Sequence, residues 1–204
     1  MRPASRLLAI GLCSLLLVAC ASTQVTAIWT EPGTTPSAFQ RVLVMGVATT
    51  PTVQQAYEDN FLAALQRAGI AGSVSHDMGQ DVRTRRSPGV ARAIERSGAD
   101  GVIVTHLAPD AVGVAAPGVR LSTIPDADRQ VAPYYQRLSA EVAKPGYYSS
   151  VQRLRLQTNL YDAKGGRLVW SGRSPPLDRN SQQTTISQVI DEMIQQLRVD
   201  GYLP

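Results

Sequence analysis

The apolar and polar positions of the chain fall into two kinds of pattern in its first half. Residues 41–47 (RVLVMGV) and 101–107 (GVIVTHL) are nearly continuous apolar runs, typical of strands covered on both faces. Apolar residues at helical spacing occupy 50–69 and 87–98, and a brief strand is expected at 71–75. This alternation predicts a β-α-β-α-β unit with parallel strands and right-handed crossovers.

The last third of the chain carries different patterns. Over 151–161, leucines alternate with Arg, Gln and Asn, which predicts a strand with one exposed face. A turn at 162–166 and a strand at 167–172 complete a hairpin, and an apolar stripe over 186–197 predicts a terminal helix. Residues 39–204 are therefore expected to form one α/β domain. Its mixed sheet would have the parallel β-α-β-α-β start, a C-terminal antiparallel hairpin and a terminal packing helix.

Residues 108–150 show neither pattern and contain five prolines and two tyrosine pairs. So long a loop in a compact domain is usually functional or disordered. Tyrosine is favoured at protein interfaces, so Tyr134, Tyr135, Tyr147 and Tyr148 are candidate contacts for a partner. In the alternative hypothesis, these tyrosines pack the loop onto its own domain. Under the contact hypothesis, a chain lacking 108–144 should still fold.

The N-terminus predicts an export signal followed by a lipid anchor. A basic start precedes an apolar run of about 13 residues, shorter than the roughly 20 that span a bilayer. Leu17-Val18-Ala19-Cys20 has the pattern of a lipobox, in which a peptidase cuts before Cys20 and the cysteine thiol is lipidated. The alternative is an ordinary signal peptide. Residues 1–19 would be the signal and 20–38 the lipidated cysteine and its tether, in which Trp29 is expected to dock on the domain or the lipid interface.

Charge and cysteine content exclude several functions for the processed chain. The formal net charge is +4, and removing Arg2 and Arg6 with the signal lowers it by two, to +2. That bias is too weak to indicate nucleic-acid binding. Cys13 would leave with the signal and Cys20 would carry lipid, so no thiol is left for a disulfide, a metal or a nucleophile.

Three polar residues are candidates for a ligand site. His76, His106 and Thr49 lie near the carboxyl ends of predicted parallel strands, the edge where α/β sheets usually bind ligands. Two histidines without a third ligand at suitable spacing are a weak metal signal, so the alternative is that they are polar edge residues. The sequence contains no nucleophile elbow, phosphate loop or dinucleotide fingerprint, so no catalytic residue, metal or cofactor is expected.

Several segments together resemble a group of uncharacterised bacterial envelope lipoproteins: the lipobox, Trp29 and Pro32 before 39–44 (FQRVLV), 65–69 (LQRAG), 98–103 (GADGVI), the hairpin 160–172 and the end of the terminal helix at 200–203. More distantly, the order of elements resembles the curli-secretion lipoprotein and the lipoprotein activators of peptidoglycan synthases. The resemblance implies a scaffold or regulatory role by contact.

The expected function is therefore that of a non-enzymatic, lipid-anchored envelope protein facing the periplasm. Its expected partners are the membrane, through Cys20, and an unidentified envelope protein. Ala21 after the cysteine implies the outer membrane by the enterobacterial sorting rule. The alternative function is a small-ligand or metal-binding periplasmic domain that uses the strand-end edge near Thr49, His76 and His106.

Overall fold

The computed structural model of the chain describes residues 25, 27–79, 82, 85–110, 119–120, 123–148, 153–178 and 183–204. The predicted signal and Cys20 lie outside these residues. The elements in chain order are β1 (Ala27–Thr30), β2 (Arg41–Val47), α1 (Pro51–Arg67), β3 (Ala71–Val74), the 3-10 helix η1 (Ser75–Met78), α3 (Ser87–Ser97), β4 (Gly101–Pro109), β5 (Val119–Arg120), the 3-10 helix η2 (Asp126–Asp128), α4 (Val131–Val142), β6 (Arg153–Asp162), β7 (Leu168–Arg173), β8 (Leu177–Asp178) and α5 (Gln183–Val199).

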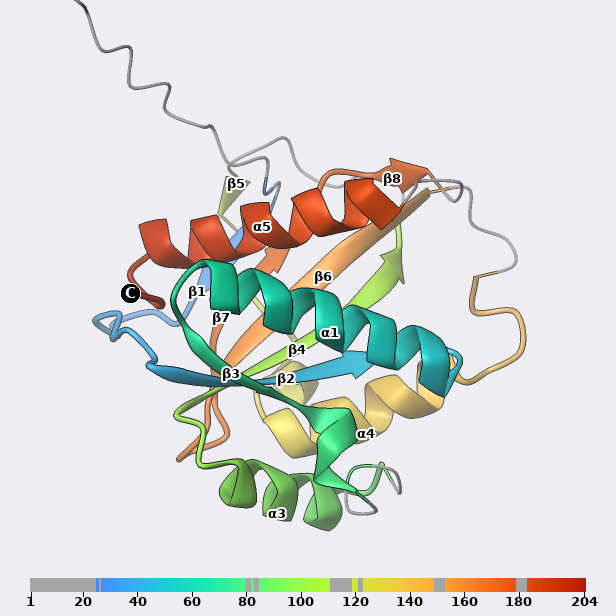
Figure 1. The fold of residues 1–204 in the computed structure, drawn as a ribbon, viewed down its shortest axis with the longest axis horizontal. Coiled ribbons are helices and arrows are strands. Elements are labelled where there is room, and N and C mark those ends of the chain that lie inside the picture. Colours follow the sequence, from blue (N-terminus) through green and yellow to red (C-terminus); the bar gives the residue numbers. More distant parts are fainter. Residues whose placement is uncertain are drawn as a thin grey trace, which may run out of the picture.

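The strands of the described residues form one mixed, eight-stranded sheet (Figure 1). Its order is β3-β2-β4-β6-β7-β1-β5, and β8 pairs with the start of β6. β2 is parallel to β3 and β4, whereas β6 is antiparallel to β4 and β7. The predicted α/β class is confirmed, including the parallel start, the C-terminal hairpin and the terminal helix.

Helices cover both faces of the sheet. α1 and α5 pack side by side on one face, and α3 and α4 pack on the other (Figure 1). α1 begins at Pro51 because Thr50 Oγ1 accepts the Val53 N–H at 3.3 Å and proline fits the first helical turn. α3 ends before Gly98, whose φ of 62° lies in the left-handed region that glycine adopts without strain.

The predicted tether contains a strand of the sheet. β1 pairs antiparallel with β7 and parallel with β5. Val25 is 2% exposed and Trp29 1% exposed, so Trp29 docks on the domain, one of its two expected positions. The prediction that 20–38 is a tether is therefore wrong from Val25 onward. The strand was missed because a four-residue apolar run is too short to show a period, and its main partner lies much later in the chain.

The prediction of a continuous loop over 108–150 is also wrong, because α4 lies within it. Its inner face consists of Val131, Tyr134, Tyr135, Leu138 and Val142, which are all buried. These positions follow helical spacing, and Pro133 is tolerated because it lies in the first turn. A chain lacking 108–144 would lose this part of the core, so the expectation that it still folds is not supported.

The polar face of β6 is buried rather than exposed. Arg155, Gln157 and Asn159 are at most 7% exposed, which contradicts the prediction of one solvent face. Their side chains form hydrogen bonds with each other and with neighbouring strands. Gln157 Nε2 donates to Asn159 Oδ1 at 2.9 Å and to Ser171 Oγ at 2.8 Å. The alternating polar residues of β6 are therefore buried rather than exposed, because their side chains form hydrogen bonds within the protein.

Candidate functional site

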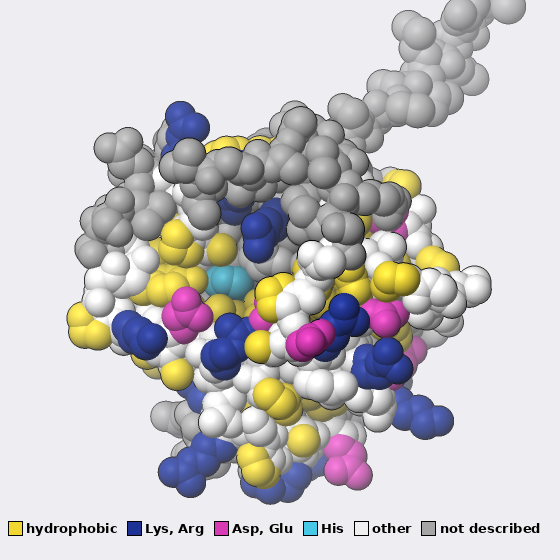
Figure 2. All heavy atoms as spheres, turned by 180° about the vertical axis from the view of Figure 1, so that it is seen from behind, with side chains coloured by type: hydrophobic (Ala, Val, Ile, Leu, Met, Phe, Trp, Pro, Cys, Tyr) yellow, Lys and Arg dark blue, Asp and Glu magenta, His cyan; other side chains and the backbone are white. Residues whose placement is uncertain are grey.

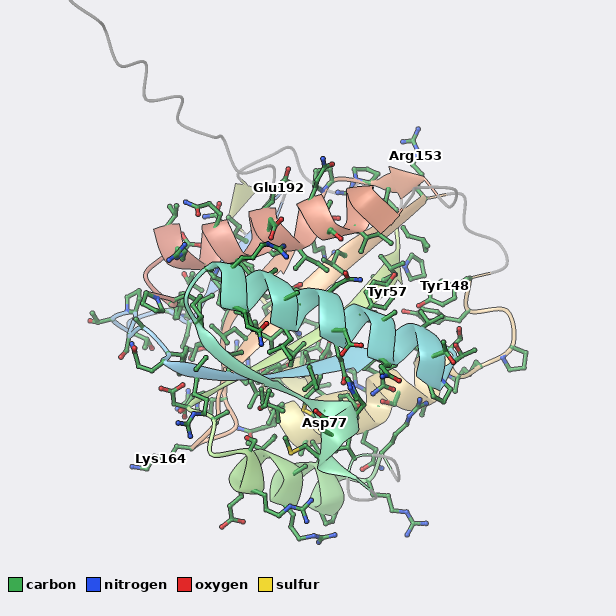
Figure 3. All side chains as sticks on the ribbon, viewed as in Figure 1. Tyr57, Asp77, Tyr148, Arg153, Lys164 and Glu192 are labelled. Atoms are coloured by element: carbon green, nitrogen blue, oxygen red, sulfur yellow. The ribbon has the colours of Figure 1, made fainter. Side chains whose placement is uncertain are left out.

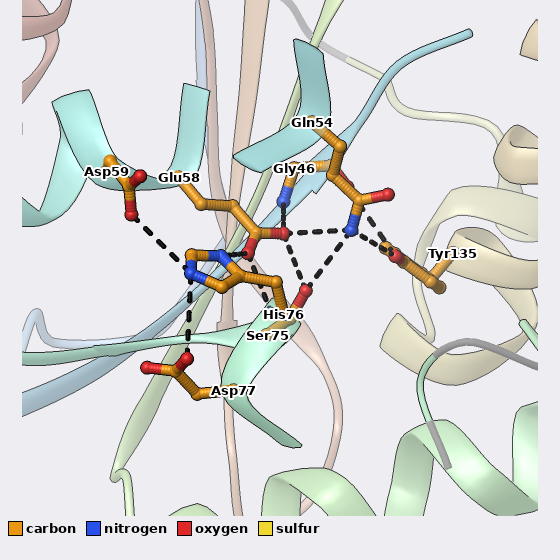
Figure 4. Close-up of polar contacts among 8 residues, drawn as sticks. All are labelled: Gly46, Gln54, Glu58, Asp59, Ser75, His76, Asp77 and Tyr135. Carbon is orange, nitrogen blue, oxygen red and sulfur yellow. Dashed lines mark hydrogen bonds and ion pairs between the residues drawn. The ribbon is translucent and has the colours of Figure 1, made fainter. Parts of the chain in front are cut away.

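A buried carboxylate joins three elements at the carboxyl end of β2 and β3 (Figure 4). Glu58 of α1 is fully buried, and its Oε1 accepts the Gly46 N–H at 2.8 Å and Gln54 Nε2 at 3.0 Å. Ser75 Oγ donates to the same oxygen at 2.5 Å. Glu58 Oε2 accepts the His76 N–H at 2.9 Å and contacts His76 Nδ1 at 2.8 Å. These donors satisfy the buried carboxylate, which fixes α1 to the strand ends.

The other side of the His76 imidazole faces two carboxylates. Nε2 lies 3.5 Å from Asp59 Oδ1 and 3.6 Å from Asp77 Oδ1, both on exposed side chains (Figure 4). In a hydrolytic triad, the serine would meet the imidazole nitrogen that the carboxylate does not occupy. Here Ser75 and His76 both bind Glu58 instead. The arrangement therefore orients the imidazole but does not activate a hydroxyl.

A hollow of about 440 Å³ lies beside this network, between the first turn of α1 and the residues that follow η1. It is lined by Pro51, Gln54, Gln55, Ser75, His76, Val82 and Arg85. His76 was among the residues predicted from the sequence, whereas Glu58 was not. The available signal was a charged residue at position 58, between Tyr57 and Phe61 on the buried stripe of α1.

Thr49 and His106 lie elsewhere, so the three ligand-edge candidates do not form one site. Thr49 shares with Tyr148 a separate hollow of about 220 Å³. His106 lies on β4 in register with Val47 and Gln157. Burial lowers the pKa of His106 from 6.5 to about 3, and the Arg173 guanidinium contributes to this decrease. Its Nδ1 has no hydrogen-bond partner among the described residues.

The tyrosines predicted to contact a partner have two different environments. Tyr134 and Tyr135 lie on the buried face of α4, which contradicts their prediction as contact residues. They follow the alternative hypothesis, in which the tyrosines pack onto their own domain. Tyr147 and Tyr148 are half-buried, with their rings edge to face at 4.8 Å, and Tyr148 Oη donates to the Leu107 carbonyl at 3.1 Å.

A larger hollow, of about 830 Å³, lies at the opposite, amino edge of the sheet. Its walls come from residues 37–39, α3, the start of α4 and the turn at 162–166, and most of its lining side chains are small or apolar. We call it the amino-edge groove. Asp100, one of its carboxylates, accepts the backbone N–H groups of Gln40 and Arg41 at 2.9 Å each. The walls of the groove come from segments that are distant in the sequence, so no local pattern predicts it.

The acidic and basic side chains of the described residues bear on two further kinds of site, a metal site and a basic nucleic-acid surface. Within the described residues, no group of three or more His, Cys, Asp and Glu side chains is placed to hold a metal ion. The same residues include no helix long and apolar enough to cross a bilayer. On the face drawn in Figure 2, the coloured Lys and Arg side chains are interleaved with Asp and Glu.

No protein-family model and no curated protein matches this chain. Among the solved structures that resemble it are two PelC dodecamers from Paraburkholderia phytofirmans. The first, a point variant, is 11% identical with a TM-score of 0.43 and covers 86% of this chain and 98% of its own. The second is 11% identical with a TM-score of 0.42 and covers 82% of this chain and 94% of its own. Likenesses this distant carry no conclusion about what this chain does or how it assembles.

Proposed function

We propose that this chain is a lipid-anchored envelope protein that binds a protein partner on the periplasmic side of the outer membrane, without catalysis. The observation that carries the contact role is the amino-edge groove, the largest hollow described above. The described chain enters β1 at Ala27, and the groove lies at the opposite end of the sheet from this residue. A partner in the periplasm would therefore meet the groove unobstructed by the anchor.

The anchoring part of the proposal rests on Leu17-Val18-Ala19-Cys20. A single acyl chain holds a protein only marginally at a membrane, whereas two or more chains anchor it stably. Bacterial lipoproteins, which this segment resembles, carry a diacylglyceryl group on the cysteine. Residence at the membrane would then be permanent, and the domain would search for partners only near that surface.

The lining of the amino-edge groove fits a protein segment better than a small substrate. Phe39, Ile94 and Val131 offer apolar surface, and the alanines around them let a partner backbone approach closely. Glu95 and Lys164 add charges of both signs. An apolar centre with a polar rim is the usual anatomy of a protein interface.

Catalysis is not supported by the groups that could perform it. Glu58 accepts backbone and side-chain donors, and His76 is held between carboxylates. Asp162, at the groove, accepts the N–H groups of Lys164 at 3.2 Å and Gly165 at 2.7 Å. These groups already stabilise the fold, and none is paired with a nucleophile in the way acyl-transfer sites require.

Substitution of the groove wall tests the contact role. Ala132→Arg on α4 and Ala91→Arg on α3 place a long charged side chain in the groove, whereas Ala140→Arg on α4 places it outside. Crosslinking in the intact envelope is expected to lose the partner in the two groove variants and keep it in the control. Thermal melting must first show that all three fold. Partners that persist in both groove variants contradict the proposal.

A further inference from the structure

We propose that the protein holds one end of its sheet against the phospholipid headgroups: the end where β7 finishes and β6 begins, marked by Arg153. The inference rests on the proposed lipid anchor at Cys20 and adds an orientation to it. Three features carry it: the strand register around β1, the short distance from Cys20 to the folded chain, and the charge at this end.

The register places the start of β1 beside this end. Ala27 lies opposite Arg173, the last residue of β7, and Arg173 lies opposite Gln157 of β6. Arg153 precedes Gln157 by four residues, so it projects beyond this row in the direction from which the chain enters β1. The chain therefore arrives from the anchor on the Arg153 side of the sheet.

The connection between anchor and domain is short. Val25 is 2% exposed and packs in the core beneath α1 and α5, and it comes five residues after Cys20 in the sequence. Five fully extended residues span at most about 17 Å. The lipidated cysteine, and with it the membrane surface, must stay within that distance of Val25.

The opposite end of the sheet lies beyond this reach. From Gln157, β6 continues five residues to Asp162, which is about 17 Å at the usual rise of a strand. The turn that contains Lys164 lies further still, and Val25 is on the other side of the row. Figure 3 shows Arg153 and Lys164 at opposite ends of the molecule. The connection therefore places the anchor at the Arg153 end of the domain, and the attraction of Arg153 to phosphate turns this end, rather than the end with the Lys164 turn, toward the bilayer.

One basic side chain at the near end, Arg153, suits a phosphate layer, and the acidic residue opposite it in the sheet is Asp178 of β8. Arg153 is exposed, and Figure 3 shows its side chain pointing away from the body of the domain. A guanidinium binds phosphate oxygens through paired hydrogen bonds, and each basic residue near an anionic surface adds attraction. The same orientation turns the amino-edge groove toward the periplasm.

Site-specific quenching tests the orientation. The lipidated chain has no free thiol, because Cys13 leaves with the signal and the Cys20 sulfur is bound to lipid. A fluorophore is placed on Pro176→Cys, exposed beside β8 at the near end, or on Lys164→Cys, exposed in the far turn. Both proteins are reconstituted in phosphatidylcholine–phosphatidylglycerol vesicles, with and without lipids that carry a nitroxide quencher on the headgroup.

The expected result is a loss of emission from the label at 176 and unchanged emission from the label at 164. Equal quenching of both labels, or stronger quenching at 164, overturns the orientation while leaving the anchor intact. Vesicle flotation separates the two proposals. A chain that does not float with the vesicles lacks the anchor, which overturns the anchoring part of the proposed function and this inference with it.

Discussion

At Glu58, Asp100 and Asp162, a carboxylate accepts hydrogen bonds from backbone N–H groups. In each case, the acidic side chain joins segments of the chain or closes a turn. Asp100 directly precedes Gly101, and Asp162 starts the turn that contains Gly165 and Gly166, so a turn role is visible without the structure. Glu58 is different, because its donors come from three elements that meet only in the folded chain.

His106 gives the stability of the fold a dependence on pH. Its folded pKa is lowered to about 3 by burial and by Arg173, while the unfolded chain keeps the ordinary value of 6.5. Between these values the unfolded chain binds the extra proton, so the free energy of unfolding falls as the pH falls, by about 1.4 kcal/mol per pH unit. Above pH 6.5 the imidazole is neutral in both the folded and the unfolded chain, so His106 no longer lowers the free energy of unfolding.

Replacing the imidazole should remove this dependence. From pH 7 to pH 5, wild type is expected to lose about 2 kcal/mol of unfolding free energy relative to His106→Gln, measured by urea denaturation. His106→Leu serves as a control. It changes the absolute stability, but because it also lacks the imidazole, wild type should lose the same unfolding free energy relative to it between pH 7 and pH 5. A difference from wild type that stays constant over this range would contradict the prediction.

At the scale of elements, the helices and strands that were predicted correctly are those whose sequence pattern is complete within one segment. β2 and β4 are nearly continuous apolar runs, and α1 and α3 each have a proline in the first turn and a glycine just after the last turn. β1 and α4 were missed for the opposite reason. β1 is stabilised by pairing with β7, far along the chain, and the prolines around α4 were interpreted as breaks although Pro133 occupies a permitted position.

The role of β1 in the core predicts a large effect of Trp29→Ala. Trp29 is 1% exposed, and the Arg129 guanidinium lies 5.7 Å from its ring centre. Removing a buried tryptophan side chain typically costs about 3–5 kcal/mol through lost burial and the cavity left behind. Urea denaturation should show that loss, whereas Thr34→Ala, exposed in the same predicted tether, should change stability by less than about 0.5 kcal/mol. A small effect at Trp29 would restore the tether interpretation.

For the whole molecule, the fold class could be predicted, but the arrangement of its surfaces could not. The strand-end rule correctly brought Thr49, His76 and His106 to one edge, yet they face different surroundings. His106 follows Val102 and Val104 on the face that α3 and α4 cover, whereas Glu58 of α1 holds His76. The side of a sheet that a residue faces depends on register, and register depends on pairing that no single segment encodes.

The short connection from Cys20 to Val25 should control how the whole molecule stands on its membrane. Inserting about 20 Gly and Ser residues between positions 24 and 25 adds a flexible segment with a root-mean-square span of about 25 Å, enough to let the domain turn over. The labels at 176 and 164 should then be quenched to similar extents, while flotation and the urea midpoint stay at their original values. If the two labels keep their original contrast, the near end must bind lipid by its own contacts, through Arg153 and its neighbours, rather than through the length of the connection. The insertion therefore separates orientation imposed by the anchor from orientation imposed by the surface.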